Sequence, residues 1–197
     1  MQLILVRHPA PDIAPGLCYG RLDVGLSPAG LATLATMRTT LAAAGISKVV
    51  TSPARRCLLL AQAITPAPII DPRLQELDFG AWEGVSWDAV PRAALDAWAA
   101  DPLAFAPPGG ETGASLIERV GRAVASLVAA GDDCIVITHG GPLRLLPALL
   151  RGQPPDLLAP APPIGAMLHV THDIAVSPAH SAATAQAPNT SPVNPPI

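Results

Sequence analysis

The stretch Leu3-Ile4-Leu5-Val6-Arg7-His8 decides the class of fold. Its four apolar residues do not alternate with polar ones, which is typical of a strand that is buried on both faces of a parallel sheet. Pro9 disfavours the α conformation at His8, so we expect the strand to end in an extended turn. The stretch Cys134-Ile135-Val136-Ile137-Thr138-His139 has the same form. The sequence therefore predicts two buried strands that are each followed by a histidine.

Strand and helix signals alternate along the chain around these two stretches. Ser27-Pro28 and Ser52-Pro53 each predict a helix start, because serine is a good N-cap and proline fits the first turn. A capping box at Ser115 and Glu118 predicts another helix, with Thr112 as an alternative start. We expect strands at 3–6, 48–51, 68–70, 134–138 and 166–171, with helices between most of them. This alternation predicts an α/β fold, a three-layer α/β/α sandwich with a mostly parallel central sheet.

The chain divides into a folded part and a tail. Its 197 residues suit a single domain of ordinary size. Beyond Asp173 the sequence contains no Asp, Glu, Lys or Arg and consists mostly of Pro, Ala, Ser, Thr and Asn. A segment of this composition buries too little apolar surface to offset the entropy lost on ordering. We therefore predict one domain over 1–173 and a disordered tail over 174–197.

Composition and charge exclude several classes of protein. The formal net charge is −3, from 12 Lys and Arg against 15 Asp and Glu, which disfavours a dedicated nucleic-acid binder. No apolar run approaches the roughly 18 residues of a membrane span, and the first run is too short for a signal peptide. The three cysteines form no C-x-x-C motif, which excludes a zinc ribbon or a thioredoxin-type redox centre. We expect a cytoplasmic protein with no cofactor, no bound metal, no nucleic-acid partner and no membrane association, and we make no prediction of its oligomeric state.

Groups suited to an anion follow three of the predicted strands. Arg7-His8 follows the first strand, residues 52–56 with two arginines follow the second, and His139-Gly140-Gly141 follows a later one. In a parallel sheet these positions meet at the carboxyl edge, where ligands bind. An uncharged imidazole is a nucleophile toward phosphorus, and arginines stabilise the charge on phosphoryl oxygens. A carboxylic acid is then needed to protonate the leaving oxygen. The nearby candidates are Glu76, Asp78 and Glu83.

The ordered set of motifs is more specific than any one of them. It comprises Arg7-His8, Thr51-Ser52-Pro53-Ala54-Arg55-Arg56, Leu74-Gln75-Glu76 with Gly80-Ala81-Trp82-Glu83-Gly84, and Thr138-His139-Gly140-Gly141. This set resembles the histidine phosphatase superfamily, with its phosphoglycerate-mutase-like fold, from Leu3 to about Gly152. Within that superfamily, residues 77–84 and 108–112 are most similar to α-ribazole phosphatases and related small phosphatases.

The resemblance implies roles for individual residues. His8 would be the phosphorylated nucleophile, and Glu76 would be the proton donor. Arg7, Arg56 and His139 would form the phosphate pocket; the family places its arginine four residues after the serine, which selects Arg56 over Arg55. Further substrate contacts are expected from Tyr19, Gly20, Gly140 and Glu111. The chain departs from the family at Pro9, where the usual glycine would supply an N–H.

These residues predict a metal-independent phosphomonoesterase that works through a phosphohistidine intermediate on a small-molecule ester. The resemblance implies α-ribazole 5′-phosphate, in cobalamin synthesis, as a substrate. Four alternatives stay open: a broad-specificity phosphatase, a phosphoglycerate mutase, an inactive module that binds a phosphorylated ligand, and a structural or interaction domain. Pro9 favours the inactive module, and the proline-rich tail favours the interaction domain.

Several other residues have structural interpretations. Arg55 is expected on a solvated helix face, and Glu83 is expected to hold a loop. Cys18 is expected to be a buried, unreactive thiol. The three tryptophans are expected to pack in the core or in a lid. The motifs of cysteine phosphatases (C-x5-R), haloacid-dehalogenase-like enzymes (D-x-D at the first strand) and P-loop enzymes are absent from the sequence.

Overall fold

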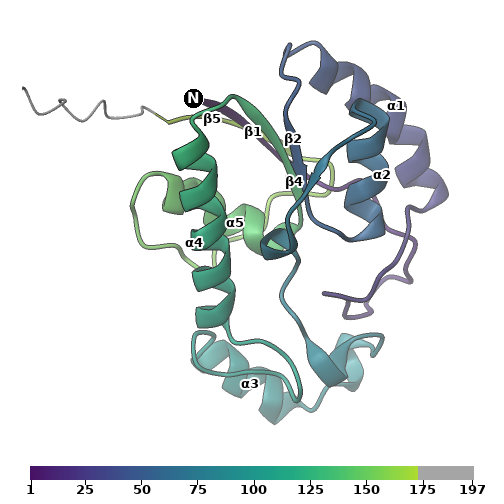
Figure 1. Cartoon of the computed structure of the whole chain (residues 1–197). Helices are drawn as coiled ribbons and strands as arrows, with labels where there is room; N and C mark the ends of the chain where they lie inside the picture. The colour runs from purple at the N-terminus through teal and green to yellow at the C-terminus, as the bar shows by residue number, and fades with distance from the viewer. Residues whose placement is uncertain (173–197) are drawn as a thin grey trace, which may run out of the picture.

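A five-stranded sheet lies at the centre of the protein. The structure is a computed structural model that describes residues 1–172 of the 197, so the tail predicted for 174–197 lies outside the described residues. The strands are β1 (Gln2–Arg7), β2 (Val49–Thr51), β3 (Ile69–Ile70), β4 (Cys134–Thr138) and β5 (Met167–Thr171). Their order is β3-β2-β4-β1-β5, and only β5 is antiparallel to its neighbour (Figure 1). The prediction of a mostly parallel sheet is confirmed.

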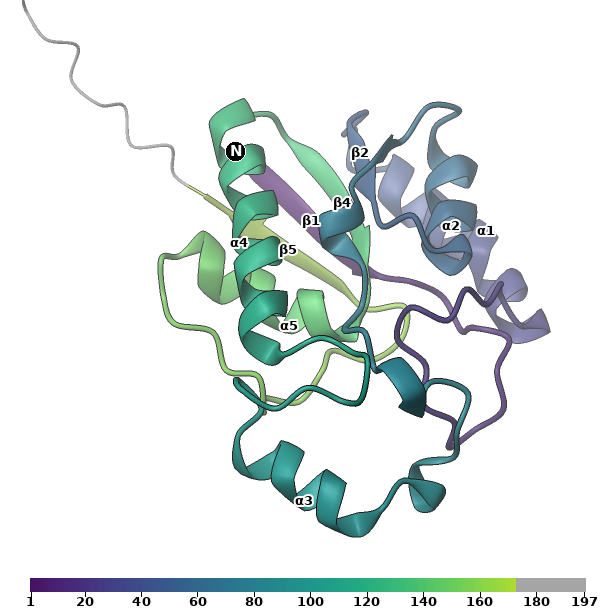
Figure 2. The ribbon, with the colours of Figure 1, turned by 60° about the horizontal axis from the view of Figure 1, so that its bottom comes forward.

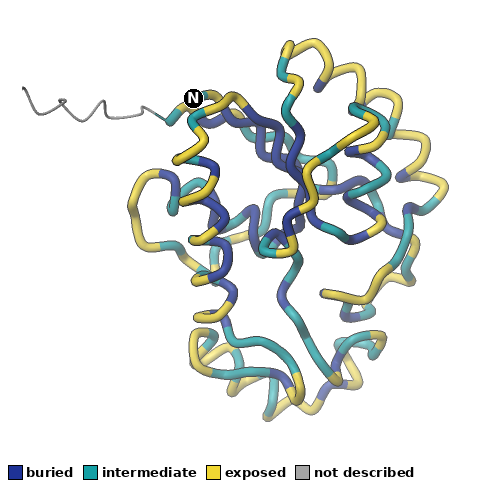
Figure 3. The backbone as a smooth tube through the Cα atoms, in the orientation of Figure 1, coloured by how far each residue is buried: buried dark blue, intermediate teal, exposed yellow. Residues whose placement is uncertain are grey.

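Helices cover both faces of this sheet. α1 (Pro28–Ala42) and α2 (Arg55–Ile64) lie on one face, and α4 (Gly113–Ala130) and α5 (Gly140–Leu150) lie on the other (Figure 1). Along β1, Leu3 and Leu5 pack into the core beneath α4 and α5, while Ile4 and Val6 pack into the core beneath α1 and α2. The strand is apolar without alternation because both of its faces are buried, and Figure 3 shows the buried centre of the sheet in dark blue. The three-layer α/β/α prediction is confirmed.

The helix starts agree only in part with the sequence prediction. Ser27 caps α1, and its side chain accepts a hydrogen bond from the Gly30 amide. The helix start expected at Ser52 is wrong, because α2 begins at Arg55 and has no side-chain cap. The α4 cap is Thr112, the alternative, rather than Ser115. Within residues 1–172, no helix is both long and apolar enough to cross a membrane.

An aromatic cluster lies beyond the carboxyl edge of the sheet. Its side chains come from α3 (Arg92–Ala100) and from the 3-10 turns η2 (Gly80–Trp82) and η3 (Trp87–Ala89), and Figure 2 shows α3 at the bottom of the view, below the sheet. Trp82 is almost fully buried there, and Trp87 stacks on Trp98 with a centroid separation of 6.3 Å. The tryptophans therefore pack against one another, as predicted. Phe79 and Trp98 of this cluster line one wall of a cavity that Arg7 also lines.

Candidate active site

His8 lies directly after β1 with its imidazole held in one tautomer. Its Nδ1 lies 2.7 Å from the carbonyl oxygen of Pro9. A carbonyl only accepts hydrogen bonds, so Nδ1 carries the proton and Nε2 keeps a free lone pair. The side chain is 1% exposed. Burial, together with the charges of Arg56 and Arg7, lowers the pKa of His8 to about 3, against the opposite effect of the hydrogen bond to Pro9. The imidazole is therefore neutral at ordinary pH.

A second histidine, His139, lies directly after β4 and faces His8. The two ring centroids are 5.2 Å apart, in an edge-on arrangement. The Nε atom of Arg56 donates a hydrogen bond to Nδ1 of His139 over 3.2 Å. The remaining proton is therefore on Nε2, which lies 2.8 Å from the hydroxyl oxygen of Ser52. Burial and the charge of Arg56 hold the pKa of His139 well below its usual range.

These buried histidines should make the stability of the protein depend on pH. Between pH 6.5 and about 3 the unfolded chain binds a proton at His8 that the folded chain does not bind. Stability should therefore fall as pH decreases through this window, by up to about 1.4 kcal/mol per pH unit for one histidine. Urea midpoints measured from pH 7 to pH 4 should decrease less steeply in a His8→Asn variant. Equal slopes in the two proteins would contradict the buried neutral imidazole.

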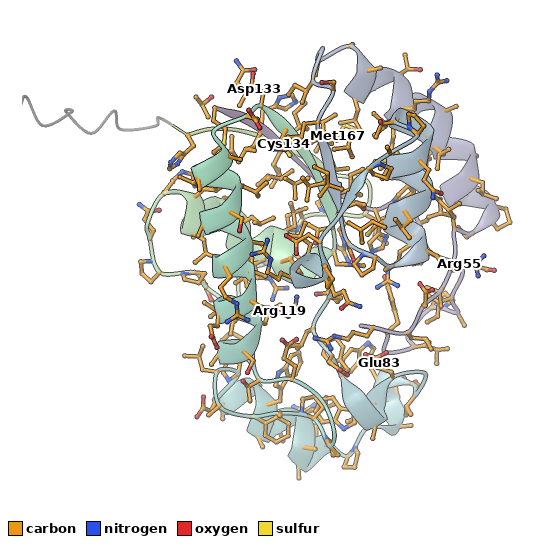
Figure 4. The ribbon with its side chains drawn as sticks, in the orientation of Figure 1. Arg55, Glu83, Arg119, Asp133, Cys134 and Met167 are labelled. Atoms are coloured by element: carbon orange, nitrogen blue, oxygen red, sulfur yellow. The ribbon has the colours of Figure 1, made fainter. Side chains whose placement is uncertain are left out.

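Arg56 is fully buried and organises one side of the site. Its Nη2 and Nη1 atoms donate to the carbonyl oxygens of Gly20 (2.6 Å) and Leu22 (2.9 Å). Its guanidinium lies over the Tyr19 ring, 5.3 Å from the ring centroid. Arg55 is exposed at the periphery, as predicted (Figure 4). The burial of Arg56 and the exposure of Arg55 agree with the choice of Arg56 as the arginine of the site.

The two glycines after His139 allow two functional side chains to approach the backbone. A Cβ atom on Gly140 would lie 3.0 Å from Cζ of Arg7, so the guanidinium packs where a side chain would otherwise be. A Cβ atom on Gly141 would lie 2.2 Å from a carboxylate oxygen of Glu76. The Gly141 amide instead donates to both carboxylate oxygens of Glu76, at 3.0 and 3.1 Å. The start of α5 thus fixes Arg7 and Glu76 beside His139.

The loop that carries Tyr19 and Gly20 is held by a carboxylate. Glu83 accepts hydrogen bonds from the amides of Arg21 (2.7 Å) and Phe79 (3.1 Å), and also from that of Leu22. These three hydrogen bonds from backbone amides to one carboxylate fix the loop against η2. Figure 4 labels Glu83 beside this turn. The prediction that Glu83 holds a loop is confirmed.

Two cavities adjoin this cluster, and Glu76 lines both. The first, of about 230 Å³, is lined mostly by polar side chains, which include His139, Arg21 and Asp23. The second, of about 370 Å³, begins at Arg7 and Gly140 and is mostly apolar beyond them. His139 lines the first cavity and Arg7 lines the second, so the Glu76 carboxylate is common to two spaces beside the cluster.

Glu111 does not reach either cavity. Its carboxylate accepts two hydrogen bonds from the guanidinium of Arg119, at 2.7 and 2.8 Å. Arg119, labelled on α4 in Figure 4, also donates to the carbonyl oxygens of Gln75 and Glu76. The pair thus supports the backbone that carries Glu76. Glu111 was expected to contact the substrate, but the structure brings it to Arg119 instead.

The family model described as "Histidine phosphatase superfamily (branch 1)" matches residues 3–172. The chain belongs to the histidine phosphatase superfamily. The match extends beyond Gly152, where the sequence resemblance was expected to end, and includes β5 at the sheet edge.

The chain is similar in sequence to two mycobacterial proteins. It is 33% identical to glucosyl-3-phosphoglycerate phosphatase of Mycolicibacterium vanbaalenii over 79% of this chain and 76% of that one. It is 30% identical to the bifunctional protein Rv2228c of Mycobacterium tuberculosis, but spans only 43% of the length of that protein.

Solved structures of the superfamily have the same fold. A mycobacterial glucosyl-3-phosphoglycerate phosphatase complexed with VO3 gives a TM-score of 0.75 at 26% identity, covering 86% of this chain and 92% of that one. The α-ribazole phosphatase of Shigella flexneri gives a TM-score of 0.71 at 28% identity, covering 78% of this chain and 81% of that one.

Two residues of this histidine phosphatase site were not assigned a role from the sequence. Ser52 was interpreted as a helix cap, yet its hydroxyl contacts His139. Arg144 lines the second cavity and belongs to none of the sequence motifs. Its position four residues after Gly140, one helical turn along α5, was the available signal.

The buried cysteines contribute no reactive thiol to the site. Burial raises the pKa of Cys18 and of Cys57 to about 12, and the pKa of Cys134 to about 11. All three are buried and unpaired. Among the described residues there is also no cluster of His, Cys, Asp and Glu side chains suited to a metal ion.

Proposed function

We propose that this histidine phosphatase hydrolyses small-molecule phosphate monoesters through a phosphohistidine at His8. The observation that carries the proposal is the hydrogen bond from Nδ1 of His8 to the Pro9 carbonyl. It leaves Nε2 unprotonated at the edge of the sheet, where the charges of Arg56 and Arg7 act on the ring. Pro9 itself lacks the N–H of the family glycine, but its carbonyl group supplies the bond that orients the nucleophile.

The proposed reaction has two steps. In the first, Nε2 of His8 forms a bond to phosphorus in line with the ester bond, which breaks as Glu76 donates a proton to the departing alcohol oxygen. In the second, Glu76 takes a proton from water, the water oxygen bonds to phosphorus, and His8 leaves as free imidazole. Arg7, Arg56 and His139 stabilise the equatorial phosphoryl oxygens throughout. Because the two arginines supply the positive charge, we propose that the reaction needs no metal ion.

The substrate is proposed as a class. The relatives named above act, by their names, on glucosyl-3-phosphoglycerate and on an α-ribazole phosphate. Both compounds are monoesters of an organic alcohol, as expected for a site with a phosphate pocket and an adjoining cavity. The buried, unpaired cysteines favour a reducing compartment, and we propose the cytoplasm.

The test is phosphate release from a panel of esters in the presence of a chelator. The panel contains 4-nitrophenyl phosphate, α-ribazole 5′-phosphate, 3-phosphoglycerate and O-phosphoserine. We expect chelator-resistant release by the wild type and none by His8→Ala. Interconversion of 2- and 3-phosphoglycerate without release would instead identify a mutase. Binding of phosphate esters with neither reaction would identify an inactive binding module.

Replacing Arg56 by lysine should lower kcat/KM by about 10²–10³-fold, the scale expected for losing a donor to transition-state charge. Lysine keeps the positive charge but cannot reproduce the planar fork that reaches Gly20, Leu22 and His139 at once. Arg55→Lys, one residue earlier and exposed, is the matched control and should stay within about twofold of wild type. Equal effects of the two substitutions on phosphate release, with unchanged circular dichroism, would contradict the assignment.

A further inference from the structure

The second cavity contains an arginine that the proposed reaction does not use. Arg144 projects from α5 one turn after Gly140 and lines this cavity with Arg7 and Glu76. Its Nη1 atom donates to the carbonyl oxygen of Leu157. Its Nε atom is buried and has no hydrogen-bond partner, and within residues 1–172 no carboxylate lies within ion-pair distance of its guanidinium.

Arg119, which lies beneath the Glu76 backbone, is satisfied within the protein, whereas the Nε atom of Arg7, like that of Arg144, has no hydrogen-bond partner in the described part of the chain. Arg119 forms two bonds with Glu111 and further bonds with backbone carbonyls. Arg144 has one carbonyl contact and no ion pair within residues 1–172: the carboxylates of Glu76 and Asp156 act on it from beyond ion-pair distance, and burial lowers its pKa. A guanidinium in that state costs free energy unless an anion reaches it. The cavity that it lines is open to a ligand and has about 370 Å³ of space.

An anion bound at Arg144 would be surrounded by the rest of the cavity lining. Apart from Arg7, Arg144 and Glu76 its lining consists of apolar side chains and glycines. Phe79 and Trp98 form an aromatic side of the cavity. Arg7 and Gly140 connect the cavity to the histidine cluster. A molecule that extends from the phosphate site into this space therefore passes the Glu76 carboxylate and meets Arg144.

We propose that the second cavity binds the alcohol part of the substrate and that Arg144 binds a carboxylate on that alcohol. The inference rests on the proposed phosphomonoesterase function and adds the substrate class. A guanidinium presents parallel N–H donors that match the two oxygens of a carboxylate. The apolar and aromatic walls accommodate the carbon skeleton of the same molecule. The preferred substrates are then phosphate esters of hydroxy acids.

The test compares 3-phosphoglycerate with glycerol 3-phosphate, which differ by a carboxylate in place of a hydroxymethyl group. Wild-type kcat/KM should be at least about 10-fold higher for 3-phosphoglycerate. Arg144→Gln should lower kcat/KM by about 10- to 100-fold for 3-phosphoglycerate and by less than about threefold for glycerol 3-phosphate. Arg144→Lys should restore part of the preference, because the charge returns without the fork. Arg151→Gln, exposed just after α5, is the matched control and should leave both values unchanged.

The outcomes separate this inference from the proposed function. Absence of phosphate release from every ester would contradict the proposed function itself. Release without a preference for the carboxylate in the wild type would overturn only the role of Arg144, and this measurement does not depend on any variant. Equal losses on both substrates in Arg144→Gln would also overturn it, because they would show a structural effect.

Discussion

Replacing His8 by asparagine should abolish turnover and the covalent phosphate on the enzyme. We expect kcat to fall by at least about 10⁴-fold, the scale of losing a nucleophile from a covalent mechanism. Asparagine is chosen because its amide N–H can still donate to the Pro9 carbonyl, so the turn after β1 keeps its hydrogen bond. Wild-type enzyme quenched during turnover of a ³²P-labelled ester should retain label that is labile to acid and stable to alkali.

The matched control is another histidine of the same chain. His169 lies on β5 and is exposed, at a position remote from both cavities. His169→Asn should therefore keep wild-type kcat and should still become labelled. If His8→Asn turned over substrate at more than a few per cent of the wild-type rate, the nucleophile would have to be another group. Label on the wild type that survived acid but not alkali would point to a carboxylate as that group.

The sequence could predict the part of the site that follows directly from strand ends. Arg7, His8 and His139 end continuous apolar strands, and parallel strands bring their carboxyl ends to one edge. Arg56 was selected by its distance from Ser52 in the family motif, and its complete burial agrees with that choice. These positions follow from local structure and from the common edge at which parallel strands end. They could therefore be predicted without knowing how the segments pack.

The rest of the site depends on contacts between segments that are distant in sequence. Glu111 lies in a stretch that resembles the phosphatase motifs, yet Arg119 binds its carboxylate across the start of α4. Ser52 has the sequence context of a helix cap, but the turn needs two more residues before α2 begins, and the hydroxyl is left to contact His139. Among the described residues, the Nε atom of Arg144 has no hydrogen-bond partner because Glu76 and Asp156 lie beyond ion-pair distance in the folded chain, which no local sequence pattern records.

Replacing Glu76 by glutamine should slow hydrolysis in proportion to how much the leaving group needs a proton. For an alkyl ester we expect kcat to fall by about 10²–10⁴-fold, the usual contribution of a positioned acid. For 4-nitrophenyl phosphate the first step should be affected far less, because the phenolate leaves without protonation. The glutamine oxygen can still accept from the Leu77 and Gly141 amides, both of which now donate to Oε1, so the local structure should persist.

The same substitution separates the two steps of the reaction. Glu76 is proposed as the base that activates water, so phosphohistidine should accumulate in Glu76→Gln after a first rapid turnover. Stopped-flow measurement with 4-nitrophenyl phosphate should then show a burst of about one nitrophenolate per enzyme, followed by slow release. Glu118→Gln, whose side chain is exposed and pairs with Arg122 on the surface of α4, should show wild-type kinetics. Equal losses on alkyl and nitrophenyl esters, without a burst, would assign Glu76 to phosphate binding rather than to proton transfer, because a binding role does not depend on the leaving group.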